Sequence, residues 1–519
     1  MIPNAQYTYE ALLRFNYFPM VKYRRDEVPP MFSTQQFTPA IADALVAATS
    51  NRPRGMGFDS VGYRATRLKN VVRKLDIPHP FPYAELCQRL RDNWGNLNYI
   101  CVNENSRIKP ERHGGRLVVM AAYAGIESDR VVVMENESFP TDLARHLDLA
   151  SGQKYRVSVD VSNCFPSLYS HSIPWALVGH AHAKSHREPA LWFNQLDAAQ
   201  RFLKRAETQG APIGPATSNI INEIIMARVD ETLRQHGYRF SRFIDDYVCF
   251  TESRDDAERF IRDVEVQLDR YLLRLNANKV KIESLPLPHK VLWVNELNMA
   301  VSAVDNFTPR RVAHFLDYAI SIQNQNPDAG IIKYAGRILE DKITVENAAV
   351  FVRYLLGLAK LHPNVLPVVA NVLEKFTVTG LSGIIKPIIS EHTEFRSSDG
   401  VCWAIYAAFL AAVRLGRRLC QTVVDTKDCL SMCLLVATNQ SVDKVDEFLN
   451  SLDLQQPYEL DQYWLLIYQR SLASGVIRTR FRAYLNESAL TVLHNRNVVF
   501  VSSPSLADFA RQRAEPFTH

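Results

Sequence analysis

Short apolar runs alternate with longer amphipathic segments between residues 151 and 300. Four of the runs are rich in β-branched or aromatic residues, which is typical of strands. They are RVSVDV (156–161), YVCF (247–250), KVKIESL (279–285) and KVLWVNEL (290–297), the last preceded by a turn at PLPHK. The segments between the runs are long enough for helices, so the pattern predicts an α+β palm.

The pattern changes near residue 308, where apolar residues recur at the spacing of a helix face. N-P, H-P, T-G and D-G pairs separate these helices, and a strand-like run returns only at VVFVSS (498–503). Such a series predicts an α-solenoid or an irregular bundle, and no fixed repeat period decides between them. We therefore expect two domains, residues 1–305 (about 1–150, then a palm over about 151–305) and an all-helical unit over 306–519.

The composition is that of a globular protein with ample core. Of its 519 residues, 47% are hydrophobic and 22% are charged. The longest apolar stretch, 401–413, is too short to cross a bilayer, and the N-terminus lacks the basic-then-apolar pattern of a signal peptide. The eight cysteines show neither a C-x-x-C pair nor zinc-like spacing. We expect reduced thiols in a cytoplasmic protein that binds no membrane.

Positive charge is concentrated in one part of the chain. The net charge is only +5, but residues 52–116 hold 13 Lys or Arg and 6 Asp or Glu. A basic surface of this kind favours phosphate-bearing ligands, although a solvated charged face gives the same pattern.

Three aspartates are the strongest candidates for chemistry. Asp245 and Asp246 lie between β-prone flanks in FSRFIDDYVCF, which predicts a tight hairpin, and Asp160 ends the run YRVSVD. Unpaired buried carboxylates cost several kcal/mol or more, so such clusters usually share a cation. Two Mg²⁺ ions, for which Mn²⁺ can substitute, would sit roughly 3.5–4 Å apart for nucleotidyl transfer. Val161, next to Asp160, is placed with the metal ligands.

Other segments near the aspartates suit a nucleotide. Phe165, five residues after Asp160, would clash with a 2′-hydroxyl and so select deoxynucleotides, or is simply a core residue. The loop QGAPIGPATSN (209–219), with Gln209, Gly210 and Pro212, allows the backbone to approach a nucleotide. Lys279, in LNANK, would protonate or neutralise the leaving pyrophosphate; a solvated lysine at a strand edge is the alternative.

These segments, in this order, resemble motifs A to D of the reverse transcriptases. DVSNCF is similar to motif A, QGAPIGPATS to motif B, FIDD to motif C (the YxDD box) and LNANK to motif D. The joint match covers residues 157–281.

The stretch DVSNCFPSLYSHSIPW (160–175) resembles the bacterial abortive-infection (Abi) reverse transcriptases, and AbiK-like, prophage-encoded members in particular. The resemblance implies a fingers and palm domain, with fingers over about 1–150, and a HEAT-like helical domain in place of a thumb. It further implies template-independent DNA synthesis from dNTPs in anti-phage defence, primed by a protein hydroxyl. The single-stranded product would stay covalently attached to a homo-oligomer in the bacterial cytoplasm.

The resemblance to the family also implies a basic residue in the fingers that binds the triphosphate. Arg112 and Arg116 are the favoured choices because guanidinium groups bind phosphate in bidentate geometry; a solvated loop is the alternative. The resemblance also implies a priming tyrosine, whose hydroxyl can replace a 3′-hydroxyl as nucleophile. The N-terminal candidates are Tyr17, Tyr23, Tyr7 and Tyr9.

Two other functions remain open. One is a conventional template-dependent, RNA-directed DNA polymerase, although a helical C-terminal half offers no obvious thumb for a duplex. The other is a catalytically silent nucleic-acid-binding scaffold, although a scaffold needs no cluster of unneutralised acids.

Overall fold

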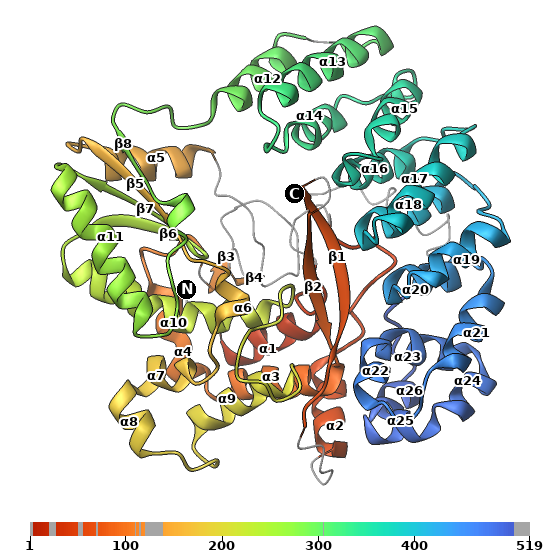
Figure 1. Ribbon diagram of the computed structural model, residues 1–519, viewed down its shortest axis with the longest axis horizontal. Coiled ribbons are helices and arrows are strands. Elements are labelled where there is room, and N and C mark those ends of the chain that lie inside the picture. The colour runs from red at the N-terminus through yellow and green to blue at the C-terminus, as the bar shows by residue number, and fades with distance from the viewer. Residues whose placement is uncertain are drawn as a thin grey trace.

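The computed structural model describes residues 4–19, 27–49, 56–68, 71–108, 110–113, 116–119, 139–304 and 306–502. Figure 1 shows a four-stranded sheet on one side, a long two-stranded ribbon in the middle, and an arc of helices from the C-terminal half on the other side. The ribbon thus lies between the sheet and the arc.

The four-stranded sheet lies within the residues predicted to form a palm. Its strand order is β6 (Arg239–Phe243), β7 (Asp246–Thr251), β5 (Tyr155–Asp160) and β8 (Lys281–Ser284), and every neighbouring pair is antiparallel. Val157 and Val159 of β5 are buried because alternate residues of a strand share one face. Helix α11 (Arg254–Asp269) packs against β5 and β7, and α10 (Ala216–Gln235) packs against α11. The predicted α+β class is confirmed.

The run KVLWVNEL is not the last strand of the palm, and that prediction was wrong. The sheet ends with β8, and the run belongs to helix α12 (Leu292–Ser302). Leu297 is buried, with Trp293 and Val301 half-buried four residues before and after it. The helical spacing of these contacts outweighs the strand propensity of the residues at the start of the run. Helix α12 packs against the first helices of the C-terminal half.

The central ribbon consists of β1 (Ser60–Leu68) and β2 (Val71–Pro78), paired antiparallel so that Arg64 lies opposite Lys74. A second hairpin joins β3 (Pro110–His113) to β4 (Arg116–Val119). The helices of this half are α1 (Ala5–Arg14), α2 (Pro39–Thr49), α3 (Pro80–Asp92), α4 (Trp94–Leu97), η1 (Asn98–Val102), α5 (Phe139–Ala150), α6 (Cys164–Ser167), α7 (Ser172–Val178), α8 (His180–Ser185), α9 (Trp192–Phe202) and η2 (Ala277–Lys279).

Helices follow one another through the C-terminal half, as the apolar spacing predicts. They are α13 (Pro309–Gln325), α14 (Ile331–Glu340), α15 (Ala348–Leu358), η3 (Pro363–Val365), α16 (Leu366–Lys375), α17 (Ser382–Glu394), α18 (Ser398–Leu410), α19 (Arg417–Asp425), α20 (Cys429–Ala437), α21 (Val442–Ser451), α22 (Pro457–Gln462), α23 (Trp464–Ala473), α24 (Gly475–Arg480), α25 (Arg482–Glu487) and α26 (Leu490–Asn495). Neighbouring helices pack in sequence, such as α17 on α18 and α18 on α20. A HEAT-like repeat stays a prediction. Within the described ranges, we find no helix with both the length and the apolar character that a bilayer span requires.

The arc of helices ends against the N-terminal segment (Figure 1). Trp464 of α23 donates its indole N–H to the carbonyl of Ile77 at 3.3 Å and stacks parallel to Tyr17, with ring centroids 6.5 Å apart. Of the predicted strand at 498–503, residue 503 lies outside the described residues, and residues 498–502 form one isolated bridge, between Val501 and Phe32. These contacts bury aromatic side chains from both ends of the described chain in one core.

Candidate active site

The three aspartates lie together at one edge of the palm sheet. Asp160 ends β5 directly opposite Asp246, the first residue of β7, and their carboxyl groups are within hydrogen-bonding reach of each other. The Val161 amide donates to the carbonyl of Asp245 at 3.2 Å, which ties the hairpin turn to the end of β5. Strand pairing therefore brings together carboxylates that are more than 80 residues apart in the chain.

The hairpin turn is held by a buried arginine. Ile244, just before Asp245, has a φ of 57°, a left-handed conformation that is strained for a β-branched residue. Its carbonyl accepts a hydrogen bond from Arg242 Nη1 at 2.6 Å. The Arg242 side chain is fully buried and forms salt bridges to Glu223 and Asp230 of α10, each at 2.7 Å. Helix α10, which follows the predicted nucleotide loop, thereby fixes the turn that carries Asp245 and Asp246.

Lys279 lies directly against the aspartates. Its Nζ contacts Asp160 Oδ2 at 2.6 Å, and Asn276 Nδ2 donates to Asp160 Oδ1 at 3.1 Å. A backbone bond from the Asn276 amide to the Asp160 carbonyl (2.8 Å) and a bridge between Val161 and Leu275 hold this loop beside β5. The LNANK segment is thus part of the acidic site, and its ammonium group neutralises one carboxylate.

The carboxyl groups have divergent pKa values. Burial raises the pKa of Asp160, but hydrogen bonds from Lys279, Asp246 and Asn276 outweigh it and leave that pKa below its ordinary value. Burial, the hydrogen bond to Asp160 and the negative charge of Asp245 raise the pKa of Asp246 to about 7. Burial and the charge of Asp160 also raise the pKa of Asp245. More negative charge is gathered here than Lys279 neutralises, which is the electrostatic condition for binding a cation.

The donor set fits a hard divalent cation. Carboxylate oxygens are the protein ligands that Mg²⁺ and Mn²⁺ favour. Over the described ranges, no three His, Cys, Asp or Glu side chains already surround a single point as ligands would. Instead the Lys279 ammonium lies on Asp160 Oδ2 (2.6 Å), as a cation would. Asp160, Asp245 and Asp246 would hold the ions, together with the backbone of Val161.

Comparison with known proteins identifies the central part of the chain. Residues 113–319 match the family described as Reverse transcriptase (RNA-dependent DNA polymerase), less than half of the chain but including all four motif segments. Residues 113–319 are a reverse transcriptase domain. No curated protein matches the sequence.

Several solved structures are similar in part. Apo telomerase from Candida tropicalis matches with a TM-score of 0.31 and 10% identity over 82% of this chain and 72% of that chain. Telomerase from Candida albicans in complex with the TWJ fragment of telomeric RNA matches with a TM-score of 0.26 and 11% identity over 82% of this chain and 71% of that chain. Apo telomerase from C. tropicalis truncated from its C-terminal domain matches with a TM-score of 0.30 and 11% identity over 45% of this chain. The match spans about half (51%) of that structure's length. These values assign no substrate or partner to this chain.

Phe165 and the glycine loop are held together within the reverse transcriptase domain. The Ala211 amide donates to the carbonyl of Phe165 at 2.8 Å, and the Gly210 amide donates to that of Leu168 at 2.7 Å. Gly210 has a φ of 91°, and a Cβ there would lie 3.2 Å from the Pro166 carbonyl oxygen, so glycine is required. Phe165 is 8% exposed, in α6 just beyond β5. The loop of Gln209, Gly210 and Pro212 therefore lies against the segment that follows Asp160.

Arg73 is a candidate that sequence reasoning missed. It lies on β2, and its positive charge lowers the pKa of Asp245, which places its guanidinium near the acidic site. The alternation of residues in VVRKLDIP (71–78) is the sequence signal from which Arg73 could have been predicted. Arg112 and Arg116 lie on β3 and β4, and their side chains are outside the described residues.

The tyrosine candidates have different environments. Tyr17 is fully buried, and its hydroxyl donates to the carbonyl of Pro78 at 2.5 Å; burial raises its pKa. Tyr9 is also buried and donates to Asp43 at 2.7 Å. Tyr7 is 41% exposed, and Tyr23 lies outside the described residues. Among the three described candidates, only Tyr7 exposes its side chain.

Proposed function

We propose that the protein is an abortive-infection DNA polymerase of the bacterial cytoplasm that adds dNTPs by two-metal nucleotidyl transfer. The convergence of Asp160, Asp245 and Asp246 beside Lys279 carries this proposal. Bound Mg²⁺ would activate the attacking hydroxyl and neutralise the triphosphate. The reverse transcriptase domain supports polymerase activity in general.

The protein's own residues have separate roles in this proposal. Asp160, Asp245 and Asp246 bind and orient the ions. Lys279 is charged, 48% exposed in its side chain, and within reach of the Asp160 carboxylate, so it can move to the leaving pyrophosphate and donate a proton there. Phe165 lies on the segment after β5 and excludes a 2′-hydroxyl, while Arg112 and Arg116 bind the triphosphate.

The C-terminal helices favour synthesis without a template. They form an arc that closes on the N-terminal segment through Trp464 and Val501, and they stand where the chain would otherwise continue into a thumb. We propose residues 1–305 as fingers and palm, and residues 306–519 as a HEAT-like domain. Priming from a tyrosine, a covalently attached single-stranded DNA product and a homo-oligomer complete the proposal.

Incubation of the full-length protein with labelled dNTPs and Mg²⁺, without added nucleic acid, tests the proposal. We expect labelled product that migrates with the protein on denaturing gels and is released by protease. Product formed only with template and primer would instead support a conventional RNA-directed DNA polymerase, and no product at all would support a silent scaffold.

Two variants test the assigned residues in the same assay. Asp245→Asn keeps the size of the side chain and should abolish synthesis without unfolding the protein; unchanged synthesis would remove the proposed site. Phe165→Ala should admit ribonucleotides, whereas an unchanged preference for dNTPs would remove the sugar-selecting role.

A further inference from the structure

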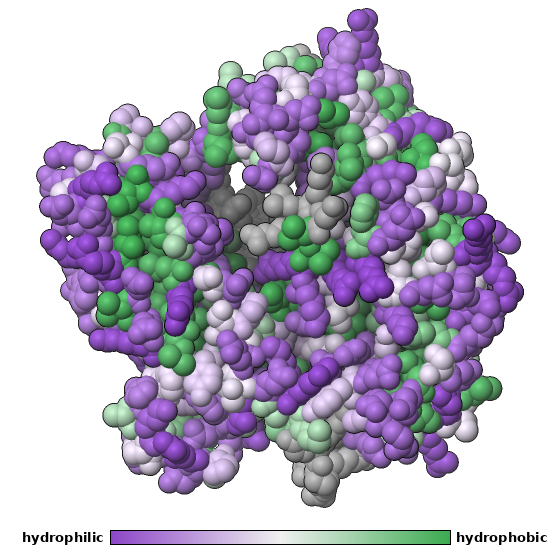
Figure 2. All heavy atoms as spheres, viewed as in Figure 1, coloured by the Kyte–Doolittle hydropathy of each residue, from purple (hydrophilic) through white to green (hydrophobic). Residues whose placement is uncertain are grey.

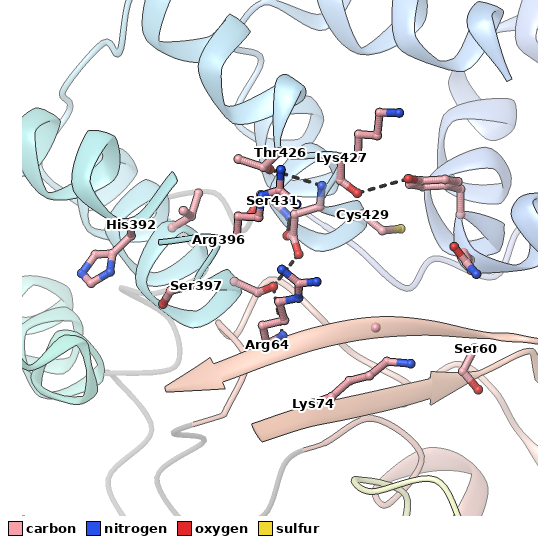
Figure 3. Close-up of a pocket in the computed structure, with 16 residues that line it drawn as sticks. Ser60, Arg64, Lys74, His392, Arg396, Ser397, Thr426, Lys427, Cys429 and Ser431 are labelled. Atoms are coloured by element: carbon pink, nitrogen blue, oxygen red, sulfur yellow. Dashed lines mark hydrogen bonds between the residues drawn. The ribbon is translucent and has the colours of Figure 1, made fainter. Parts of the chain in front are cut away.

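A cavity lies on the ribbon, away from Asp160, Asp245 and Asp246. It has a volume of about 460 Å³ and is enclosed by β1, β2 and the turns that precede α18, α20 and α23 (Figure 3). Successive residues of a strand point to opposite faces. Lys74 lines the cavity, whereas its neighbour Arg73 lies near Asp245, so the cavity and the acidic site are on opposite faces of the ribbon.

The floor of the cavity carries two facing cations. Arg64 of β1 and Lys74 of β2 are directly opposite each other in the ribbon, and like charges at such a position destabilise a strand pair. Lys74 has a partner in Asp76, at 3.2 Å. Arg64 is exposed and has no salt bridge among the described residues. Figure 3 shows its guanidinium pointing from the strand toward the helix ends. An anion bound here would relieve the repulsion.

Arg396 and Lys427 of the helical arc also line the cavity, and Figure 3 shows the Lys427 side chain extending away from Arg64 and Lys74. Arg396 follows α17 and Lys427 follows α19, and both have left-handed backbones, with φ of 50° and 57°. Both side chains are exposed and, within the described part of the chain, form no salt bridge. Figure 2 shows hydrophilic surface where the ribbon meets the arc. The positive charge of the cavity thus comes from two parts of the fold that are more than 300 residues apart.

Polar groups complete the lining. Four hydroxyl residues near the starts of α18 and α20 also line the cavity, and their hydroxyl groups are already hydrogen-bonded within the fold: Ser397, Ser398, Thr426 and Ser431. One acid, Asp428, also lines the cavity, and it accepts hydrogen bonds from the Ser398 hydroxyl and the Ser431 amide. Gly62 leaves room for a lysine stem, because a Cβ there would lie 3.0 Å from Lys74 Cε. Basic residues thus outnumber acidic ones in the lining.

We propose that this cavity binds the phosphate group of a nucleotide, either free or at the end of a DNA strand. Guanidinium and ammonium groups are the usual partners of phosphate, and Arg64, Lys74 and Arg396 supply them in this lining. The volume lies within the range of roughly 300–1,000 Å³ for small-ligand sites. This site does not depend on the proposed polymerase activity.

Binding measured without divalent cations tests the site separately from catalysis. Equilibrium dialysis with EDTA present would use dTMP, 5′-phosphorylated hexathymidylate, its 5′-hydroxyl form and inorganic phosphate, on the full-length protein. We expect Arg64→Gln/Arg396→Gln to weaken binding at least about tenfold, since each lost charged hydrogen bond approaches that factor. Arg64→Gln alone, at an exposed position, is a second variant that should fold normally. Arg414→Gln removes the same charge at the far end of α18 and should bind as wild type.

Each outcome decides the proposal. Binding of dTMP that is lost in the cavity variants and kept in Arg414→Gln supports a free nucleotide. If only the 5′-phosphorylated oligonucleotide binds in this way, the ligand is the end of a DNA strand. If only inorganic phosphate does, the cavity holds a phosphate subsite alone. Equal binding to wild type and cavity variants, loss in Arg414→Gln as well, or no binding of any probe would overturn the proposal. Because the assay contains no divalent cation, its outcome is the same whether or not the chain has polymerase activity.

Discussion

Arg242→Met tests how the catalytic hairpin is supported. The wild-type guanidinium is fully buried and donates to Glu223 at 2.7 and 2.9 Å, to Asp230 at 2.7 Å and to the Ile244 carbonyl at 2.6 Å. The two carboxylates have side-chain exposures of 1% and 0%. Methionine fills much of the volume but leaves two negative charges unpaired in the core.

Removing one partner of a buried ion pair costs about 3–5 kcal/mol, and we expect the free energy of unfolding to fall by that amount at pH 8. Without Arg242 the folded state holds protons on these carboxyls more tightly than the unfolded state does. The variant should therefore regain stability as the pH falls from 8 to 5.5. Urea unfolding followed by circular dichroism at both pH values measures the deficit.

Two controls separate charge from position. Arg254→Met breaks a surface pair with Glu258 and should cost about 1 kcal/mol or less. Adding Glu223→Gln and Asp230→Asn to Arg242→Met removes the unpaired charges and should restore most of the stability. Nucleotide incorporation should stay low in this triple variant because the Ile244 carbonyl still lacks its donor. A deficit below about 1 kcal/mol for Arg242→Met, or one equal at both pH values, would refute the reasoning.

Three further results are expected. Lys279→Met removes the cation that lowers the pKa of Asp160, so the acid limb of the pH–rate profile should move to higher pH. The rate should also fall about 10²-fold, because the proton donor is lost. An acid limb that does not move would contradict this prediction. Metal binding, measured by Mn²⁺ titration, should strengthen as the pH rises through about 7, because Asp246 loses its proton there. The metal-free protein should lose stability over the same rise, because the Asp246 carboxyl binds its proton more tightly in the folded than in the unfolded state. A flat pH response would contradict both expectations. Arg73→Gln should raise the KM for dNTPs about tenfold with unchanged thermal stability, as loss of one charged contact implies; an unchanged KM would exclude contact with the triphosphate.

The local features of the site were predictable from sequence, whereas its supports were not. The runs around Asp160 and Asp246 show the period-two pattern of strands, which can be recognised from a few consecutive residues. The structure has the strands β5 and β7 at these positions. Arg242 is one of two arginines in β6, and only the positions of Glu223 and Asp230 on helix α10 explain why it, and not Arg239, is buried.

Long-range packing also explains the other differences. In the segment 290–297, β-branched residues favoured a strand, but contacts with the following helices fix the helix α12. Tyr17 gave no sign of burial in sequence, because the rings that stack on it come from Tyr83 and Trp464, both distant in the chain. The cavity on the ribbon likewise needs side chains from the ribbon and from the arc, a pairing that no local pattern predicts.

Anomalous diffraction from crystals of the full-length protein grown with Mn²⁺ and a non-hydrolysable dNTP analogue tests the central claim most directly. We expect two Mn²⁺ peaks roughly 3.5–4 Å apart, within ligand distance of Asp160, Asp245 and Asp246, and loss of at least one peak in Asp245→Asn. Data at saturating Mn²⁺ that place no ion between these three side chains would contradict the account.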